Sequence, residues 1–453
     1  MLTLLAPFLA QLVTATAGAR VEGRAIRSDA SYYEAAARPS VALDFAGRHL
    51  DVALQYSPTL TLTPLESNPE LLVFHSGGLF VNYGWRNTTY TVGEFVGYGL
   101  LNFRSLAVAG AIGVGSPTTG NTGTGIPTGT GTPTGTGTPV GTGIPTGTTG
   151  TGTPTGTPGG SQGQTNGTLH CNTTSAMQTG AGCAQNVRYE TSVTSAGVNH
   201  AFSANTILQV GFAYLVTGAL GAENKFGAEQ AQADRDVRFI YPRVQGPLVS
   251  GLLTELLDRT NRVAASLTFQ LSSASNGSDL WLAATQETWS HDFSPRTTSQ
   301  LGAGFSVGRT WRTDGYIAYS IYPTFLSALI HQAPTYPGTL VFTVGVSSAP
   351  VLDPSPTAIV LDPRVTILGT VAWQRERFFA AVGGNTTFSY GGPSQNTIAL
   401  FGANAGLGYQ FARPFSMDAG MRAAYQHYAG AAVLPLTYAA YVGMTFGLGG
   451  ALN

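Results

Sequence analysis

The chain has 453 residues, only 10% of them charged, and a formal net charge of −1. Typical soluble domains carry about 25% charged residues, so a soluble protein with this composition would have little surface repulsion to keep it dispersed. The net charge also argues against a nucleic-acid partner, because no basic surface is present to displace counterions. The composition therefore favours a protein whose apolar side chains face lipid.

Residues 1–19 have the pattern of a secretory signal peptide. Leu2–Val13 is mostly apolar, and Ala17-Gly18-Ala19 before Arg20 fits the small-residue cleavage rule, although no basic residue precedes the apolar stretch. A transmembrane anchor is the alternative, but the stretch is too short to span about 30 Å of hydrocarbon. We expect cleavage after Ala19, followed by a periplasmic leader over residues 20–48.

From about His49 to Leu448, short segments place apolar residues at every second position, with small or polar residues between them. The last segment shows this pattern with the apolar residues Leu436, Tyr438, Ala440, Val442, Met444, Phe446 and Leu448. Successive side chains of a strand point to opposite faces, so the pattern predicts sheets with one apolar and one polar face. Its repetition, without helical periodicity of comparable length, predicts an all-β protein: a transmembrane antiparallel β-barrel over residues 49–449.

Alternation and turn residues predict sixteen strands, with fourteen or eighteen as near alternatives. In chain order they cover 49–63, 70–86, 87–104, 186–199, 204–219, 245–258, 260–274, 278–293, 297–312, 314–332, 338–348, 360–375, 377–390, 396–411, 414–428 and 433–449. Barrels of this type have short periplasmic turns and longer outer loops, and an even strand number puts both chain ends in the periplasm. Under this rule the long connections 105–185, 220–244 and 349–359 all fall on the outer side.

The outer loop 105–185 contains a low-complexity segment, residues 116–165, built almost entirely of Gly, Thr and Pro. Such a composition has no apolar surface to bury against the entropy of ordering, so we expect a disordered, solvated segment. It is interpreted as a flexible spacer, with a Thr-rich, O-glycosylated surface stalk as the alternative.

The two cysteines, Cys171 and Cys183, lie in the same outer loop. In an exported chain the natural interpretation is one local disulfide. A metal site is the alternative, but two thiolates with only His170 nearby make an incomplete ligand set.

With a signal peptide, alternating strands and an aromatic-rich terminal strand, the chain resembles Gram-negative outer-membrane β-barrels. The resemblance covers nearly all of the mature chain, and the Gly-rich, Arg-over-Lys style is similar to that of myxobacterial barrels. It implies insertion into outer-membrane lipid by the barrel-insertion machinery. The tail Phe446–Asn453 departs from the family habit of ending on an aromatic residue.

The polar set of each strand is expected to line the lumen. For example, if Val263 and Leu267 face lipid, then Arg262 and Gln270 face inward. The lumen-facing candidates carry charges of both signs among small neutral residues: Asp51, Gln55, Arg188, Glu190, Arg262, Gln270, Gln374, Asn404, Gln410, Asp418 and Arg422.

Neither the seven histidines nor the Gly-rich segments form an enzyme motif. His291 stands beside Asp292, but adjacent strand residues point to opposite faces. The sequence has no Ser nucleophile motif, no metal-ligand His spacing and no phosphate-binding Gly loop. We therefore expect no catalytic residues, no cofactor and no metal.

These features favour a protein of the cell outer membrane that acts as a passive, porin-like channel for small solutes, since about sixteen strands can enclose an aqueous lumen. The alternative is a surface display or adhesion protein that uses the Thr/Gly/Pro-rich loop. An outer-membrane enzyme is disfavoured because no catalytic constellation is found.

Overall fold

The computed structural model describes residues 12–27, 31–47, 49–62, 71–102, 186–222, 242–312, 315, 317–354, 359–390, 398–412, 414–428 and 437–452. Their regular structure is entirely β: β1 Leu12–Arg27, β2 Ser31–Ala46, β3 Leu50–Tyr56, β4 Thr59–Leu62, β5 Leu71–Trp85, β6 Thr88–Asn102, β7 Asn186–Ala201, β8 Thr206–Ala222, β9 Val244–Leu256, β10 Asn261–Ala274, β11 Asp279–Ser294, β12 Thr297–Trp311, β13 Ile317–Thr335, β14 Gly338–Pro354, β15 Ile359–Arg375, β16 Phe378–Ser389, β17 Ile398–Ala412, β18 Phe415–Tyr428 and β19 Thr437–Leu452. Across these ranges, no helix is long and apolar enough to cross a membrane.

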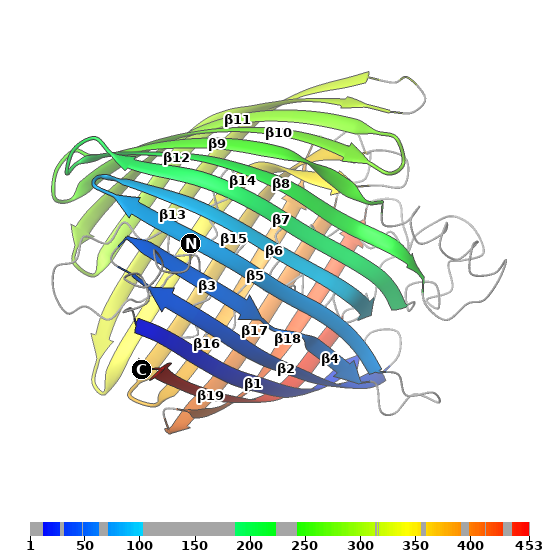
Figure 1. The fold of residues 1–453 in the computed structure, drawn as a ribbon, viewed down its shortest axis with the longest axis vertical. Coiled ribbons are helices and arrows are strands. Elements are labelled where there is room, and N and C mark those ends of the chain that lie inside the picture. The colour runs from blue at the N-terminus through cyan, green and yellow to red at the C-terminus, as the bar shows by residue number, and fades with distance from the viewer. Residues whose placement is uncertain are drawn as a thin grey trace, which may run out of the picture.

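The strands form one closed antiparallel barrel (Figure 1). Each strand pairs with its neighbours in sequence, and β19 pairs with β1 to close the ring. The segments β3 and β4 share one position between β2 and β5, so nineteen labelled segments make eighteen strand positions. The break falls at Ser57-Pro58, because proline has no N–H to donate to the ladder. The predicted barrel is confirmed, with eighteen strands in place of sixteen.

The sequence-based prediction missed the first two strands, β1 and β2. Residues 20–48, expected to be a periplasmic leader, lie largely in these two strands, and the barrel begins at Leu12 instead of His49. Residues 12–19, assigned to the signal peptide, form the first half of β1 and pair with both β2 and β19. The outward face of β1 carries Ala15, Ala17, Ala19 and Ala25, and that of β2 is interrupted by Ala35, Ala37 and Pro39, so the alternation of apolar and polar residues is weak there.

The two ends of the barrel differ in their connections. The first and last strands meet where Val13 is opposite Leu452, at the same end as short turns such as Arg86-Asn87 and Glu376-Arg377. The connections from β6 to β7 and from β8 to β9 join the strands at the other end. Most of the expected outer loop, including residues 116–165, Cys171 and Cys183, lies outside the described residues.

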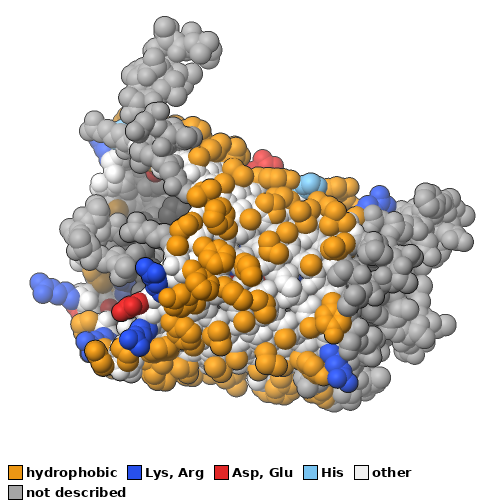
Figure 2. All heavy atoms as spheres, turned by 90° about the horizontal axis from the view of Figure 1, so that it is seen from below, with side chains coloured by type: hydrophobic (Ala, Val, Ile, Leu, Met, Phe, Trp, Pro, Cys, Tyr) orange, Lys and Arg blue, Asp and Glu red, His pale blue; other side chains and the backbone are white. Residues whose placement is uncertain are grey.

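The outer face of the barrel is apolar. On β19 it carries Tyr438, Val442, Met444, Phe446 and Leu448, each of them exposed, and Figure 2 shows apolar side chains spread over the barrel wall with charged groups near its ends. Alternate positions on the same strand, such as Ala439 and Tyr441, are buried. This arrangement is that of a transmembrane barrel, which presents apolar residues to lipid and polar residues to its interior.

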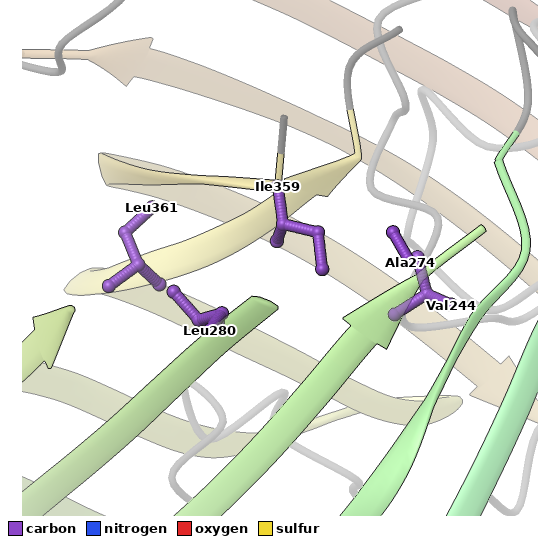
Figure 3. Packing of buried hydrophobic residues seen from close by; sticks show 5 residues of the cluster. All are labelled: Val244, Ala274, Leu280, Ile359 and Leu361. Carbon is purple, nitrogen blue, oxygen red and sulfur yellow. The ribbon is translucent and has the colours of Figure 1, made fainter. Parts of the chain in front are cut away.

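One hairpin departs from this simple wall. Toward the tip of the β14–β15 hairpin, Ile359 and Leu361 are 0% and 1% exposed and pack against Leu280, Ala274 and Val244 (Figure 3). These three partners come from the inward faces of β11, β10 and β9.

Further contacts extend across β12 and β13. A Cβ at inward-facing Gly308 of β12 would lie 2.1 Å from Leu361 Cδ1, which places this leucine inside the barrel. The backbone N–H of Ile359 donates to Ser278 Oγ at 2.9 Å, and the Tyr322 hydroxyl donates to the Leu361 carbonyl at 3.4 Å. The hairpin end therefore folds inward and covers the inner wall formed by β9–β13.

Candidate lumen site

A cluster of seven charged side chains faces inward where the barrel closes. These positions alternate with exposed outward residues such as Val21, Val41 and Met421. Because the cluster joins the first strands to the last, we call it the seam cluster: Arg20, Glu22 and Arg24 of β1, Glu34 and Arg38 of β2, and Asp418 and Arg422 of β18.

The central contact is the ion pair between Arg20 and Asp418, which crosses over β19. Arg20 Nη1 and Nη2 each donate to one oxygen of the Asp418 carboxylate, both at 2.8 Å. The intervening strand has Gly443 at this position, and a Cβ there would lie 2.7 Å from Arg20 Nη2. The bidentate pair thus depends on a glycine that leaves space above β19, and it ties the first strand to the last two.

The two other carboxylates are held by β1 arginines. Glu22 accepts from Arg20 at 3.1 Å through Oε2 and from Arg24 Nε through Oε1. Arg24 also reaches Glu34, with Nη1 3.7 Å from Oε2. Each carboxylate of the cluster is therefore paired with Arg20 or Arg24.

Arg422 has an aromatic neighbour instead. Its guanidinium lies 4.8 Å from the centre of the Tyr441 ring, a cation–π geometry. Space for Tyr441 of β19 comes from glycines on β18 and β17, since a Cβ at Gly420 would be 2.7 Å from the tyrosine hydroxyl and one at Gly406 3.3 Å. Asn404 of β17 is the cross-strand partner of Arg422 and faces inward beside it.

The arginines of the cluster are more accessible than its carboxylates. The side chains of Arg20 and Arg24 are 17% and 13% exposed, against 5%, 0% and 9% for Glu22, Glu34 and Asp418. Arg38 and Arg422 are also partly exposed. Within the described part of the chain, neither of these two has a carboxylate in salt-bridge distance. The cluster therefore presents mainly positive charge to the lumen.

The structure places nine of the eleven predicted lumen residues on the inward face. They alternate with exposed apolar residues such as Leu54, Leu267 and Tyr409. The nine are Asp51, Gln55, Arg262, Gln270, Gln374, Asn404, Gln410, Asp418 and Arg422. Only Asn404, Asp418 and Arg422 come together with the seam cluster.

The expectation for Arg188 and Glu190 is wrong. Glu190 is the cross-strand partner of outward-facing Tyr98, and Arg188 follows the same alternation. Glu190 forms an ion pair with Arg243, which immediately precedes β9. Strand β7 carries few large apolar residues, so its alternation does not show from sequence alone which set faces lipid.

Sequence reasoning missed the β1 and β2 members of the cluster because it assigned them to a leader. A usable signal was present: Arg20, Glu22 and Arg24 occupy every second position, separated by Val21 and Gly23. Such a period-two run of charges is typical of the polar face of a strand. In the described ranges, no group of three or more His, Cys, Asp or Glu side chains is placed to hold a metal ion.

No known protein family matches the chain, and no curated protein matches it. Among solved structures, the FrpB iron transporter from Neisseria meningitidis (F5-1 variant) matches with a TM-score of 0.50 and 7% identity, over 94% of this chain and 64% of that one. OccK2 (OpdF) from Pseudomonas aeruginosa matches with a TM-score of 0.45 and 10% identity, over 98% and 99% of the two chains. The chain thus spans less than two thirds of the FrpB chain. The shared feature is the fold, a β-barrel of the Gram-negative outer-membrane type.

Proposed function

We propose that the protein is a porin-like channel through which small solutes cross the outer membrane by passive diffusion. The observation that carries this proposal is the seam cluster itself, a set of charged side chains on the inner wall of an eighteen-strand barrel. Charged groups in this position need water or ion partners, and barrels of about sixteen to eighteen strands leave an aqueous lumen.

The arrangement of the two walls supports the same function. Counting β3 and β4 as one position, β1 and β11 lie nine positions apart in a ring of eighteen, so they are on opposite sides. The inward hairpin packs over β9–β13, the wall across from the seam cluster. A solute path along the seam cluster is therefore compatible with the hairpin in its observed position.

Conductance of the purified barrel in a planar bilayer tests the proposal. Heat-modifiable migration in gels first establishes that the protein is folded, because closed barrels migrate differently before and after boiling. We expect stepwise ion currents, together with swelling of protein-containing liposomes in small neutral sugars. Folded, inserted protein that gives neither signal would overturn the channel proposal and favour the display function.

A further inference from the structure

The seam cluster contains two arginines that its own carboxylates do not neutralise. Both oxygens of Asp418 accept from Arg20, and the two oxygens of Glu22 accept from Arg20 and Arg24. Glu34 is fully buried at its side chain and lies beside Arg24. The acidic groups are thus already engaged, and Arg38 and Arg422 gain no direct ion pair from them.

These two arginines nevertheless converge with the others. Arg38 is the direct cross-strand partner of Arg20, and its charge interacts with those of Arg24, Arg20 and Arg422 as well as Glu22. The strands of Arg38 and Arg422 are separated by β1 and β19, about 14 Å at the usual strand spacing. Two long side chains that project inward from such positions can both reach one small ligand between them.

The orientation of Arg422 is also restricted before any ligand binds. Its guanidinium lies over Tyr441, whose hydroxyl occupies the space that the glycines at 406 and 420 leave on the inner face. A planar guanidinium held in this way offers two parallel N–H donors, a geometry that matches a carboxylate or a phosphate oxygen pair.

We propose that Arg38 and Arg422 form an oxyanion-binding station in the lumen, so that the channel favours small anionic solutes over cations. The inference deepens the proposed function and rests on it. The ligand is defined by its chemistry, a small carboxylate or phosphate that bridges the two guanidiniums and relieves the repulsion among four neighbouring arginines. Arg20 and Arg24 act as positioning residues, since their charges are already paired with the acids.

The test compares ion selectivity in planar bilayers under a potassium chloride gradient. Wild-type protein is expected to prefer chloride over potassium by about 25-fold, because one fixed charge at ~4 Å in water-like dielectric enriches chloride about fivefold and depletes potassium by a similar factor. The double variant Arg38→Gln and Arg422→Gln leaves two arginines against three carboxylates, so it should lose the chloride preference and shift toward potassium. The double variant Arg259→Gln and Arg296→Gln removes the same charge from turns outside the lumen and should keep it.

Binding is measured separately by titrating sodium succinate or inorganic phosphate against the chloride current. Both probes should block the wild-type current at low concentration, and the ratio of the two blocks distinguishes carboxylate from phosphate preference. The variant Arg38→Lys and Arg422→Lys keeps the charge but not the forked donors, so it should stay anion-selective while block weakens about tenfold, the loss of one charged hydrogen bond.

The outcomes separate the two proposals. Absence of current from folded wild-type protein overturns the channel and the station together. If the Gln double variant conducts with unchanged selectivity and unchanged block, the channel proposal is supported and the oxyanion-binding station is overturned. Block that is equal in the Lys and wild-type proteins shows only a diffuse positive field and also contradicts a bidentate station.

Discussion

On both facing walls of the barrel, an inward glycine makes room for a side chain from another strand, but the two side chains differ in chemistry. On the seam wall, inward Gly443 leaves the space that the Arg20 guanidinium occupies on its way to Asp418. On the opposite wall, inward Gly308 leaves the space for Leu361 from the folded-in hairpin. One glycine accommodates a charged side chain and the other an apolar one. A glycine on the inner face thus indicates that a side chain from another strand packs closely over it. Whether that side chain is charged or apolar depends on which segment lies across the glycine.

The two walls also differ in what they contribute to stability and to solute passage. On the opposite wall the hairpin end packs against an apolar cluster, which stabilises the barrel and itself offers no charge to a solute. The seam wall keeps its charged groups on the inner surface and ties the first strand to the last ones.

The largest effect should come from removing the start of β1. Deletion of residues 12–19 removes the half-strand that pairs with Phe446–Leu452 of β19 and with the end of β2, so the ring cannot close along that length. We expect no heat-modifiable folded form after refolding. Mass spectrometry of the exported protein should likewise find residues 12–19 retained, and a mature chain that begins at Arg20 would contradict the role of β1 as a full strand.

Loss of the seam ion pair should be the next largest effect. The variant Asp418→Ala leaves the Arg20 guanidinium without its bidentate partner, and we expect destabilisation of about 3 kcal/mol, the low end for breaking one side of a buried pair. Urea unfolding in lipid vesicles measures it. Gly443→Leu should give a loss of the same kind by filling the space that the pair crosses, whereas Gly23→Leu, where a Cβ meets no atom within 4 Å, serves as control.

The apolar wall is tested by Leu280→Ala. This side chain is 1% exposed against the hairpin, so we expect a loss of about 2–3 kcal/mol and a larger single-channel conductance as the hairpin loosens. Leu301→Ala is the matched control, because Leu301 is 49% exposed on the outer face, where lipid replaces the lost contacts. Equal destabilisation by the two variants would contradict the packing role of the hairpin.

The smallest effect concerns the turn between β9 and β10, whose residues belong neither to the hairpin's apolar cluster nor to the seam cluster. Hydrogen bonds from the Asn261 side chain and from Thr260 hold the pKa of Asp258 well below its ordinary value. A lowered folded pKa contributes stability above the unfolded pKa of about 3.9, and this is lost as the pH falls further. The difference in unfolding midpoint between wild type and Asp258→Asn should therefore shrink on acidification, and a constant difference would contradict the assignment.

Much of the barrel was predictable because strand alternation is a local property. The expected strands 278–293 and 414–428 differ from β11 and β18 by a residue at their ends. The same rule failed where the alternation is weak. It did not identify the Ala-rich β1 and β2 as strands, and it assigned the wrong set of β7 residues to the lumen. In the candidate site, alternation identified three inward-facing residues, Asp418, Arg422 and Asn404. The leader assignment excluded the other five, which are Arg20, Glu22, Arg24, Glu34 and Arg38.

The class of fold, the order of most strands and the face of most side chains follow from the period-two geometry of neighbouring residues, so they are predictable without a structure. In contrast, the contact between Arg20 and Asp418, which are 398 positions apart, and the position of Leu361 over Gly308 are seen only in the folded barrel. Those contacts depend on ring closure and on the inward fold of one hairpin, which bring together strands that no local pattern relates.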